Sequence, residues 1–458
     1  MERYLRRKID TTLVDWKRSP DRLPLIIKGP RQVGKTASVR HFAAGRYESV
    51  IEINFVESPS YRSICDNGYS VQAIIRAISL LNPYHRFIPG KTLIFFDEIQ
   101  AFPDIATSLK FFREDGRFDV ICSGSLLGFR MQQIESVSVG SKTDFTMRAL
   151  DFEEFGWARG YGEDLVGMID EHVRDVKPFA QVEMEKCLEL FFDYCVLGGM
   201  PAVVSNHVAK KGFESSLAIQ RQLLLDYEED IQKYLKGLDR TRVLGVFRRI
   251  PAQLAKENKK FQISKVASGA RSREYEGCVE WLENAGMILR CSALAFPELP
   301  IRGNEDLSRY KLYFHDTGLL VACLEDEVQG DLRANRNLGV YKGALYENFV
   351  ASALAAQDYP LCYYKRDVGS LEEDFFVRNA DSLIPVEVKA CSNRAKALKT
   401  LIGSDRYPDI SFGIKFGNAN VGFAGRVLTM PWFCAFRLRE TLKEFDPDKA
   451  EADSSIDT

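Results

Sequence analysis

The sequence LPLIIKGPRQVGKT at residues 23–36 decides the fold of the N-terminal part of this chain. Its apolar beginning, Leu23 to Ile27, is typical of a buried strand. The rest has the G-x-x-x-x-G-K-T spacing of a phosphate-binding loop. Ser38 to Ala44 then continue without Gly or Pro, as a helix does, and this context argues against an accidental match. We therefore predict a strand, a loop and a helix that together hold the phosphates of a nucleotide.

Each residue type in this loop has a chemical purpose. Glycines let the backbone turn its N–H groups toward phosphate oxygens, beside the positive N-terminal end of the helix. Lys35 adds a full positive charge, and the hydroxyl of Thr36 is a ligand for Mg²⁺. The predicted nucleotide-binding residues are Gly29, Pro30, Arg31, Gln32, Val33, Gly34, Lys35 and Thr36.

A pair of carboxylates follows another predicted strand. Residues 91–100 read KTLIFFDEIQ, in which an apolar run ends in Asp97 and Glu98. In an open parallel sheet, ligands bind outside the carboxyl ends of the strands, so this pair should face the phosphates. We predict that Asp97 holds the magnesium shell and that Glu98 orients or deprotonates the attacking water. The alternative is a solvated acidic turn, which can end any strand.

Further strands complete the predicted sheet. Residues 50–56 and 144–150 have apolar strand patterns, and the strand at 118–122 delivers Ser123 to the same edge. We expect the Ser123 hydroxyl to sense the γ-phosphate or to hold the attacking water, although small polar residues after a strand are also ordinary turn formers. Helical patterns at 71–81 and 104–112 separate the strands, which predicts a parallel sheet with right-handed crossovers.

Composition places the chain among globular proteins. Its 458 residues suggest about three domains. Hydrophobic residues make up 45%, charged residues 28%, and the net charge of −2 gives no general attraction to nucleic acid or membranes. The ten cysteines have neither zinc spacing nor a disulfide pattern. With no signal-like or membrane-length apolar segment, we expect a cytoplasmic protein without a membrane partner.

Several segments together resemble a family of prokaryotic AAA-type ATPases whose C-terminal half is a domain of unknown function. The segments are GPRQVGKT at 29–36, FFDEIQ at 95–100, CSGS at 122–125, LDFEEF at 150–155, GGMP at 198–201, DYEEDIQKY at 226–234 and KLYFHDTGLL at 311–320. They extend over nearly the whole chain. The resemblance implies binding of ATP and Mg²⁺, with Gly34, Lys35, Thr36, Asp97 and Glu98 on the Walker motifs of that family.

The middle of the chain is helical and then basic. Residues 179–235 have helical periodicity, and residues 240–290 carry eleven Lys and Arg against five Asp and Glu. The latter segment predicts helices at 243–258, 264–268 and 271–284 and then a strand, a pattern typical of a winged helix. Arg271 and Arg273 would begin the recognition helix and contact DNA. The alternatives are a solvated basic face and a protein-binding module.

The C-terminal part carries a second set of acidic residues. Glu347 falls on a predicted helix, Asp374 at a strand, and Glu387 and Lys389 in PVEVKA on a neighbouring strand, where alternation puts both on one face. Asp374 and Glu387 are predicted to share a Mg²⁺ while Lys389 positions a water, with Glu347 as a further member of this second metal site. The segment resembles nucleases of the PD-(D/E)xK type. The pattern is loose, and an ordinary acidic turn before a basic strand is the alternative.

These predictions combine into one α/β architecture. We expect an AAA-type P-loop parallel sheet, then a helical and winged-helix region, and then a C-terminal α/β nuclease-like domain. The expected parts are an ATPase domain at 1–160, a helical linker region at 161–239, a winged-helix-like domain at 240–330, a nuclease-like domain at 335–440 and an acidic, disordered tail at 441–458.

The function that we predict is Mg²⁺-dependent ATP hydrolysis that drives or switches the C-terminal half, with DNA as a candidate partner through residues 240–290. The alternatives are a nucleotide-regulated DNA- or protein-binding switch with little hydrolysis, and an ATP-gated, metal-dependent nuclease. Arg130, Arg148 and the segment 139–144 are only weak candidates for an arginine finger. Without one, we expect slow hydrolysis unless a homo-oligomer or a partner protein supplies the missing cation.

Overall fold

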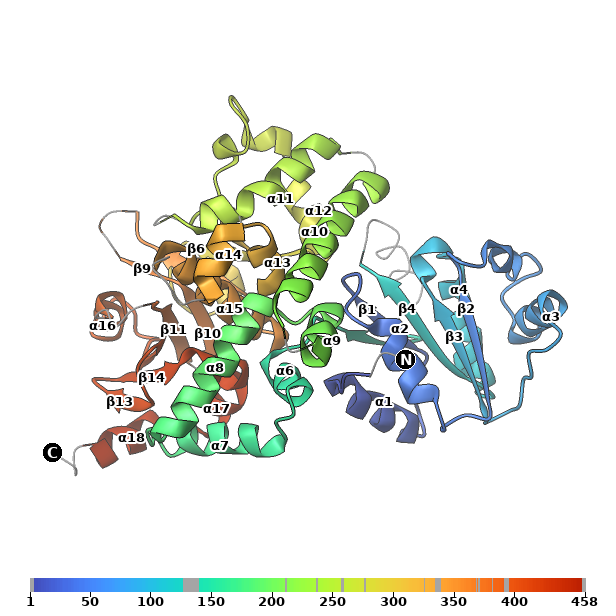
Figure 1. Ribbon diagram of the computed structural model, residues 1–458, viewed down its shortest axis with the longest axis horizontal. Coiled ribbons are helices and arrows are strands. Elements are labelled where there is room, and N and C mark those ends of the chain that lie inside the picture. The colour runs from blue at the N-terminus through green and yellow to red at the C-terminus, as the bar shows by residue number, and fades with distance from the viewer. Residues whose placement is uncertain are drawn as a thin grey trace. The chain divides into compact units, whose positions relative to one another are not determined.

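The computed structural model describes residues 4–454 except 127–139, 211, 236–237, 257–258, 276, 325, 334–338, 368, 370, 381 and 391–394. The chain divides into two compact units (Figure 1). The first is residues 1–149 with the short segments 234–236 and 284–286, and the second is the remainder. The finer boundaries expected within the second unit stay predictions.

Five parallel strands form the sheet of the first unit. Their spatial order is β2 (Ser49–Asn54), β3 (Thr92–Asp97), β4 (Asp119–Ser125), β1 (Leu25–Gly29) and β5 (Thr143–Thr146). All five are strands that the sequence predicts, so the parallel α/β sheet is confirmed. Because the strands are parallel, the carboxyl ends of β1, β3 and β4 meet at one edge.

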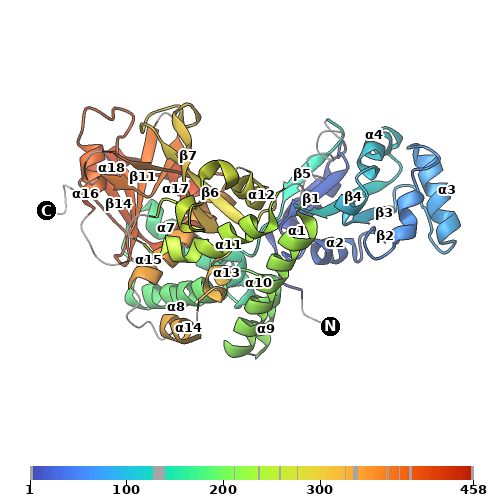
Figure 2. The ribbon, with the colours of Figure 1, turned by 90° about the horizontal axis from the view of Figure 1, so that it is seen from above.

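Helices cover both faces of this sheet. They are α1 (Lys8–Arg18), α2 (Lys35–Ala43), α3 (Val71–Leu81) and α4 (Ile105–Asp115), with short 3₁₀ turns at η1 (Pro59–Ser63) and η2 (Ile99–Ala101). The buried side chains of α3 and α4 pack with alternate residues of β2, β3 and β4 in one apolar core. On the other side, α1 packs on α2, and α2 packs on β1, β3 and β4 (Figures 1 and 2).

The second unit begins with helices and continues with two sheets. Its first helices are α6 (Phe152–Ala158), α7 (Glu163–Arg174), α8 (Gln181–Leu197), α9 (Pro201–Lys210), α10 (Glu214–Tyr234), α11 (Arg240–Leu254) and α12 (Cys278–Asn284). The later helices are α13 (Thr317–Ala322), α14 (Asp326–Arg333), α15 (Gly339–Ala356), α16 (Lys396–Ile402), α17 (Leu438–Glu444) and α18 (Pro447–Ser454). The helical region predicted over 179–235 is therefore confirmed.

One sheet of the second unit has four strands and the other has five. The first is ordered β7 (Glu305–Phe314), β6 (Ile288–Leu294), β8 (Cys362–Lys365) and β9 (Glu372–Glu373). The other is ordered β10 (Phe375–Asn379), β11 (Ser382–Val388), β12 (Gly413–Gly417), β14 (Val427–Pro431) and β13 (Gly422–Ala424). Helix α15 packs against β6 and β7 of the first sheet and β11 of the second, so its side chains reach both.

The predicted recognition helix differs from the structure. In place of one helix over 271–284, a 3₁₀ turn, η4 (Ser272–Tyr275), precedes the separate helix α12. Gly277 between them has a φ of +78°, which does not belong to a right-handed helix. Arg271 precedes the 3₁₀ turn and Arg273 lies on it, both exposed, so the prediction that they begin a recognition helix was wrong.

The tail also differs from its prediction. Residues predicted to be disordered form the end of α17 and all of α18. Phe445 lies between these helices, and its ring packs on Phe412 and Phe423 at centroid distances of 5.5 and 5.4 Å. Composition was misleading here because one aromatic anchor can order a short polar segment.

Two expectations drawn from composition concern the cysteines and membrane-spanning segments. Their nine cysteines are free thiols, and seven of them are buried. Within the same part of the chain, no helix combines the length and the apolarity that crossing a membrane requires.

Candidate functional site

The loop between β1 and α2 has the backbone geometry of an anion-binding site. Gly34 precedes the first residue of α2 with a φ of +97°, and Gln32 has a φ of +61°. Left-handed residues within a tight turn bring successive N–H groups to the same side, where they can donate to an anion. The N-terminal end of α2 adds its positive partial charge. The loop predicted to hold phosphates thus has the shape that this task needs.

Gly29 is required at the start of the loop by a close approach of the backbone. A Cβ at this position would lie 2.1 Å from the carbonyl oxygen of Met147. The Met147 N–H donates to the carbonyl oxygen of Lys28 at 2.7 Å, so the segment after β5 is held against β1. Only glycine fits where these two backbones meet.

Lys35 lies inside the loop, with only 7% of its surface exposed. Its ammonium donates to the carbonyl oxygens of Gly29, at 3.1 Å, and Pro30, at 2.7 Å. Burial lowers the pKa of Lys35 to about 8, although the carboxylates of Glu98 and Asp97 favour its charged form. The lysine is therefore a buried cation held by the loop where phosphates would be bound.

Asp97, at the end of β3, accepts hydrogen bonds from several elements of the first unit. Its Oδ2 accepts from the Thr36 hydroxyl at 3.0 Å and from Nδ2 of Asn54 at 3.2 Å. Its Oδ1 accepts from the hydroxyl of Ser123 and from the Glu98 N–H, the latter at 3.0 Å. Hydroxyl and carboxylate oxygens are ligands that Mg²⁺ prefers, so Thr36 and Asp97 fit this ion.

Glu98 is oriented by a glutamine that the sequence analysis missed. Glu98 has a φ of +55°, and its Oε2 accepts a hydrogen bond from Nε2 of Gln100. Oε1 of Gln100 accepts from the N–H of Ser125 at 3.2 Å, which ties it to the end of β4. Little in the sequence indicates these supporting residues: Asn54 stands at the end of a predicted strand, and Gln100 stands just after the carboxylate pair.

The structure brings together most of the residues predicted for this site. The loop residues 29–36, Asp97, Glu98 and Ser123 all lie at the carboxyl edge of the sheet. Ser123 is fully buried and its hydroxyl donates to Asp97, and its role in sensing phosphate or water stays a prediction. Arg148 follows β5, where its carbonyl oxygen accepts from Arg7 at 2.7 Å, while Arg130 lies outside the described residues.

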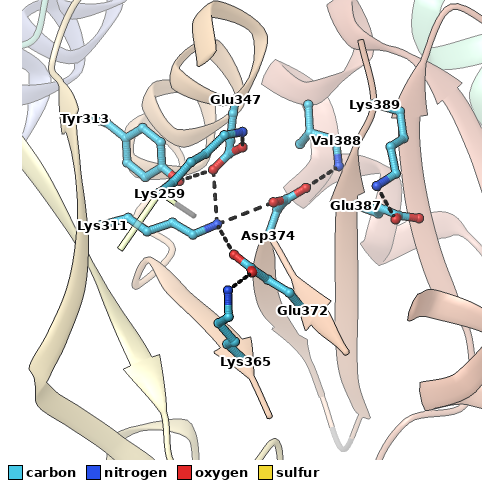
Figure 3. Close-up of polar contacts among 10 residues, drawn as sticks. All are labelled: Lys259, Lys311, Tyr313, Glu347, Lys365, Glu372, Asp374, Glu387, Val388 and Lys389. Atoms are coloured by element: carbon cyan, nitrogen blue, oxygen red, sulfur yellow. Dashed lines mark hydrogen bonds and ion pairs between the residues drawn. The ribbon is translucent and has the colours of Figure 1, made fainter. Parts of the chain in front are cut away.

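A second cluster of charged side chains lies in the second unit (Figure 3). The ammonium of Lys311, from β7, lies 3.2 Å from Oε1 of Glu347 on α15 and 3.4 Å from Oδ1 of Asp374. Lys311 has none of its side chain exposed, and Glu347 has 1%. Lys259 forms an ion pair with the other oxygen of Glu347. Glu347 and Asp374 thus lie in one cluster, as predicted, but the cation between them is the ammonium of Lys311.

The charges in this cluster stabilise one another. Burial alone would raise the pKa of Glu347, but the ammonium groups of Lys259 and Lys311 lower it to about 2. For Lys311, burial favours the neutral amine, but Glu347, Asp374 and Glu372 outweigh it and raise the pKa. Glu347 and Lys311 are therefore both charged near neutral pH.

Glu387 and Lys389 pair with each other. The Lys389 ammonium lies 2.6 Å from Oε1 of Glu387, so both side chains are on one face, as predicted. Burial raises the pKa of Glu387 and of the adjacent buried Glu373. Among the described residues, no group of three or more His, Cys, Asp or Glu is arranged to hold a metal ion. The second metal site stays a prediction.

Three segments of the chain match known family models. Residues 21–156 match an AAA domain. Residues 188–329 match a domain of unknown function (DUF8612), and residues 342–434 match another (DUF4143). The chain therefore carries an AAA-type P-loop domain followed by segments of unestablished function. A search of curated proteins finds no match.

The solved structures that this chain resembles are remote from it. A Walker-type ATPase of Pyrococcus abyssi is 13% identical, with a TM-score of 0.43 over 70% of this chain and 96% of that one. The Orc1 protein of Aeropyrum pernix, solved in complex with DNA, is 14% identical, with a TM-score of 0.28 over 71% of this chain and 92% of that one. Similarities this low carry no argument about the activity of this chain.

Proposed function

We propose that this protein binds ATP with Mg²⁺ at the carboxyl edge of the first unit's sheet and hydrolyses it there. One observation carries the proposal: the Thr36 hydroxyl lies 3.0 Å from Asp97 Oδ2, directly beside the phosphate-binding loop. These two oxygens belong to residues of α2 and β3, so the hydrogen bond between them connects the phosphate-binding loop to the carboxylate pair. A Mg²⁺ bound here would neutralise charge on the phosphate oxygens.

Each residue of the site has its own part in the proposed reaction. The loop N–H groups and Lys35 bind the phosphates, with Lys35 exchanging its two carbonyl contacts for phosphate oxygens. Asn54 and Ser123 hold the carboxylate of Asp97 in place. Glu98, held by Gln100, accepts a proton from the attacking water. In this proposed reaction the attacking water lies in line with the bond to the leaving phosphate, which is the geometry that hydrolysis requires.

The test separates binding from turnover. Glu98→Gln keeps the shape of the side chain but removes the proton acceptor, so ATP should still bind while phosphate release falls by about 10² or more. Calorimetry measures the first quantity and a phosphate assay the second. Glu114→Gln, at an exposed position of α4, is a matched control that should leave both unchanged. A Glu98→Gln variant with wild-type turnover would show that Glu98 is not the base.

DNA contact is a second candidate function, for the basic segment 240–290. Lys260, Arg273 and Arg290 line one cavity of about 660 Å³ beside η4. Glu280 also lines this cavity, and Arg290 pairs with Glu283 at 3.1 Å. The three cations still outnumber the one lining carboxylate, which favours a phosphate-bearing partner over a purely structural role. The antiparallel pair of β6 and β7 follows α11, η3 (Ile263–Lys265), η4 and α12, in an order that supports a winged-helix-like arrangement.

A further inference from the structure

The cation at the centre of the acidic cluster in the second unit is a lysine of the chain itself. Lys311 is fully buried, and its ammonium lies within ion-pair distance of three carboxylates (Figure 3). The nearest oxygens are 3.2 Å away on Glu347, 3.4 Å away on Asp374 and 3.6 Å away on Glu372. Three carboxylates around one small cation are what a divalent metal site usually offers.

Every carboxylate oxygen of Glu347 and Asp374 accepts a hydrogen bond from the chain. Oε1 of Glu347 accepts from Lys311 and, at 2.5 Å, from the hydroxyl of Tyr313, while Oε2 accepts from Lys259. Oδ1 of Asp374 accepts from Lys311, and Oδ2 accepts from the N–H of Val388 at 3.0 Å. All four oxygens of these two carboxylates thus have donors, whereas Oε2 of Glu387, the third predicted carboxylate, and both oxygens of the adjacent buried Glu373 have none among the described residues.

The balance of charges in the cluster also argues against a metal ion at this point. The ion-paired cluster has three lysines, Lys259, Lys311 and Lys365, and three carboxylates, Glu347, Glu372 and Asp374, so its charges balance. A divalent cation would leave this region with two excess positive charges. In a buried place such an excess costs several kcal/mol unless a cation leaves. A metal ion therefore does not fit at the position that the Lys311 ammonium occupies.

We propose that the Lys311 ammonium is the permanent cation of this cluster and takes the place of a divalent metal. The cluster then fastens β7 to α15 and to the segment entering β10. Lys311 belongs to the segment matching the first domain of unknown function, whereas Glu347 and Asp374 belong to the second. The lysine thus links these two segments. The proposal is independent of ATP hydrolysis by the first unit.

Calorimetry on the wild-type chain tests the metal directly. Mn²⁺ is titrated into the full chain without nucleotide, and the same titration is made with Asp374→Asn. We expect no binding heat, or a heat that Asp374→Asn leaves unchanged because the ion binds elsewhere. A heat that is present in the wild type and absent from Asp374→Asn would overturn the proposal. This measurement does not depend on whether a lysine variant folds.

Replacing the lysine supplies the complementary test. Lys311→Met keeps the unbranched shape and most of the length of the side chain but leaves three carboxylates without their central cation. The melting temperature of the second unit should therefore fall by roughly 5–10 °C. Millimolar Mn²⁺ should recover part of that loss in Lys311→Met and should not raise the wild-type value. The matched control is Lys365→Met, since Lys365 is 37% exposed and pairs only at the edge of the cluster. A Lys311→Met protein as stable as the wild type would contradict the proposal.

Discussion

Raising the pH through the pKa of Lys35 should weaken ATP binding. Burial lowers that pKa to about 8 in the free protein. Bound phosphates favour the charged ammonium, so the pKa is higher in the complex, and binding takes up a proton above pH 8. Affinity should therefore be nearly constant below about pH 7 and should fall as the pH rises beyond 8.

The size of this effect follows from the pKa. With a value near 8, about three quarters of Lys35 is charged at pH 7.5 and about one eleventh at pH 9. The dissociation constant for ATP should then rise by about eightfold over this interval. The last ionisation of a phosphate lies near pH 6, so the ligand itself changes little here.

The assay is calorimetry of Mg-ATP binding at pH 7.5 and pH 9. Lys35→Arg is the matched control, because a guanidinium stays charged throughout this range and its affinity should not change with pH. A wild-type affinity that stays constant would refute the reasoning. An equal fall in Lys35→Arg would refute it as well, because the titrating group would then be another one.

Two further predictions concern other parts of the chain. Gly29→Ala would bring a Cβ to 2.1 Å from the Met147 carbonyl oxygen, so it should lower the melting temperature of the first unit by several degrees and weaken ATP binding. Gly167→Ala, with open space around its Cβ, should change neither quantity. Equal behaviour of the two variants would contradict the steric argument. Changing Arg271 and Arg273 together to Ala should weaken DNA binding and reduce the slope of its salt dependence by the equivalent of up to about two phosphate contacts. Unchanged binding at several salt concentrations would instead indicate a protein-binding or structural module.

The nucleotide site could be predicted from sequence because its chemistry lies in short, contiguous motifs. The loop at 29–36 and the pair Asp97 and Glu98 each follow an apolar strand, and parallel pairing brings strand ends together. Helix α3 has the same bounds, Val71–Leu81, as its sequence pattern, because no Gly or Pro interrupts it and its apolar side is continuous. Gln100 was missed because an amide after a carboxylate pair has no distinctive spacing.

Other features depend on contacts that a linear pattern does not contain. The contact between Lys311, Glu347 and Asp374 joins β7, α15 and the start of β10, and no spacing rule predicts which cation such a cluster receives. The split between η4 and α12 depends on the positive φ of Gly277, because a single glycine is compatible with a helix pattern. In the tail, α18 follows Phe445, whose ring packs on Phe423 of β13 and on Phe412, which directly precedes β12.

Phosphate release from ATP by the purified chain, with and without Mg²⁺, tests the central claim most directly. The proposed site predicts release that requires Mg²⁺, because Thr36 and Asp97 supply its oxygen ligands, and that disappears in a folded Lys35→Ala variant. Release that continues in the presence of a chelator, or that survives Lys35→Ala, would contradict the account.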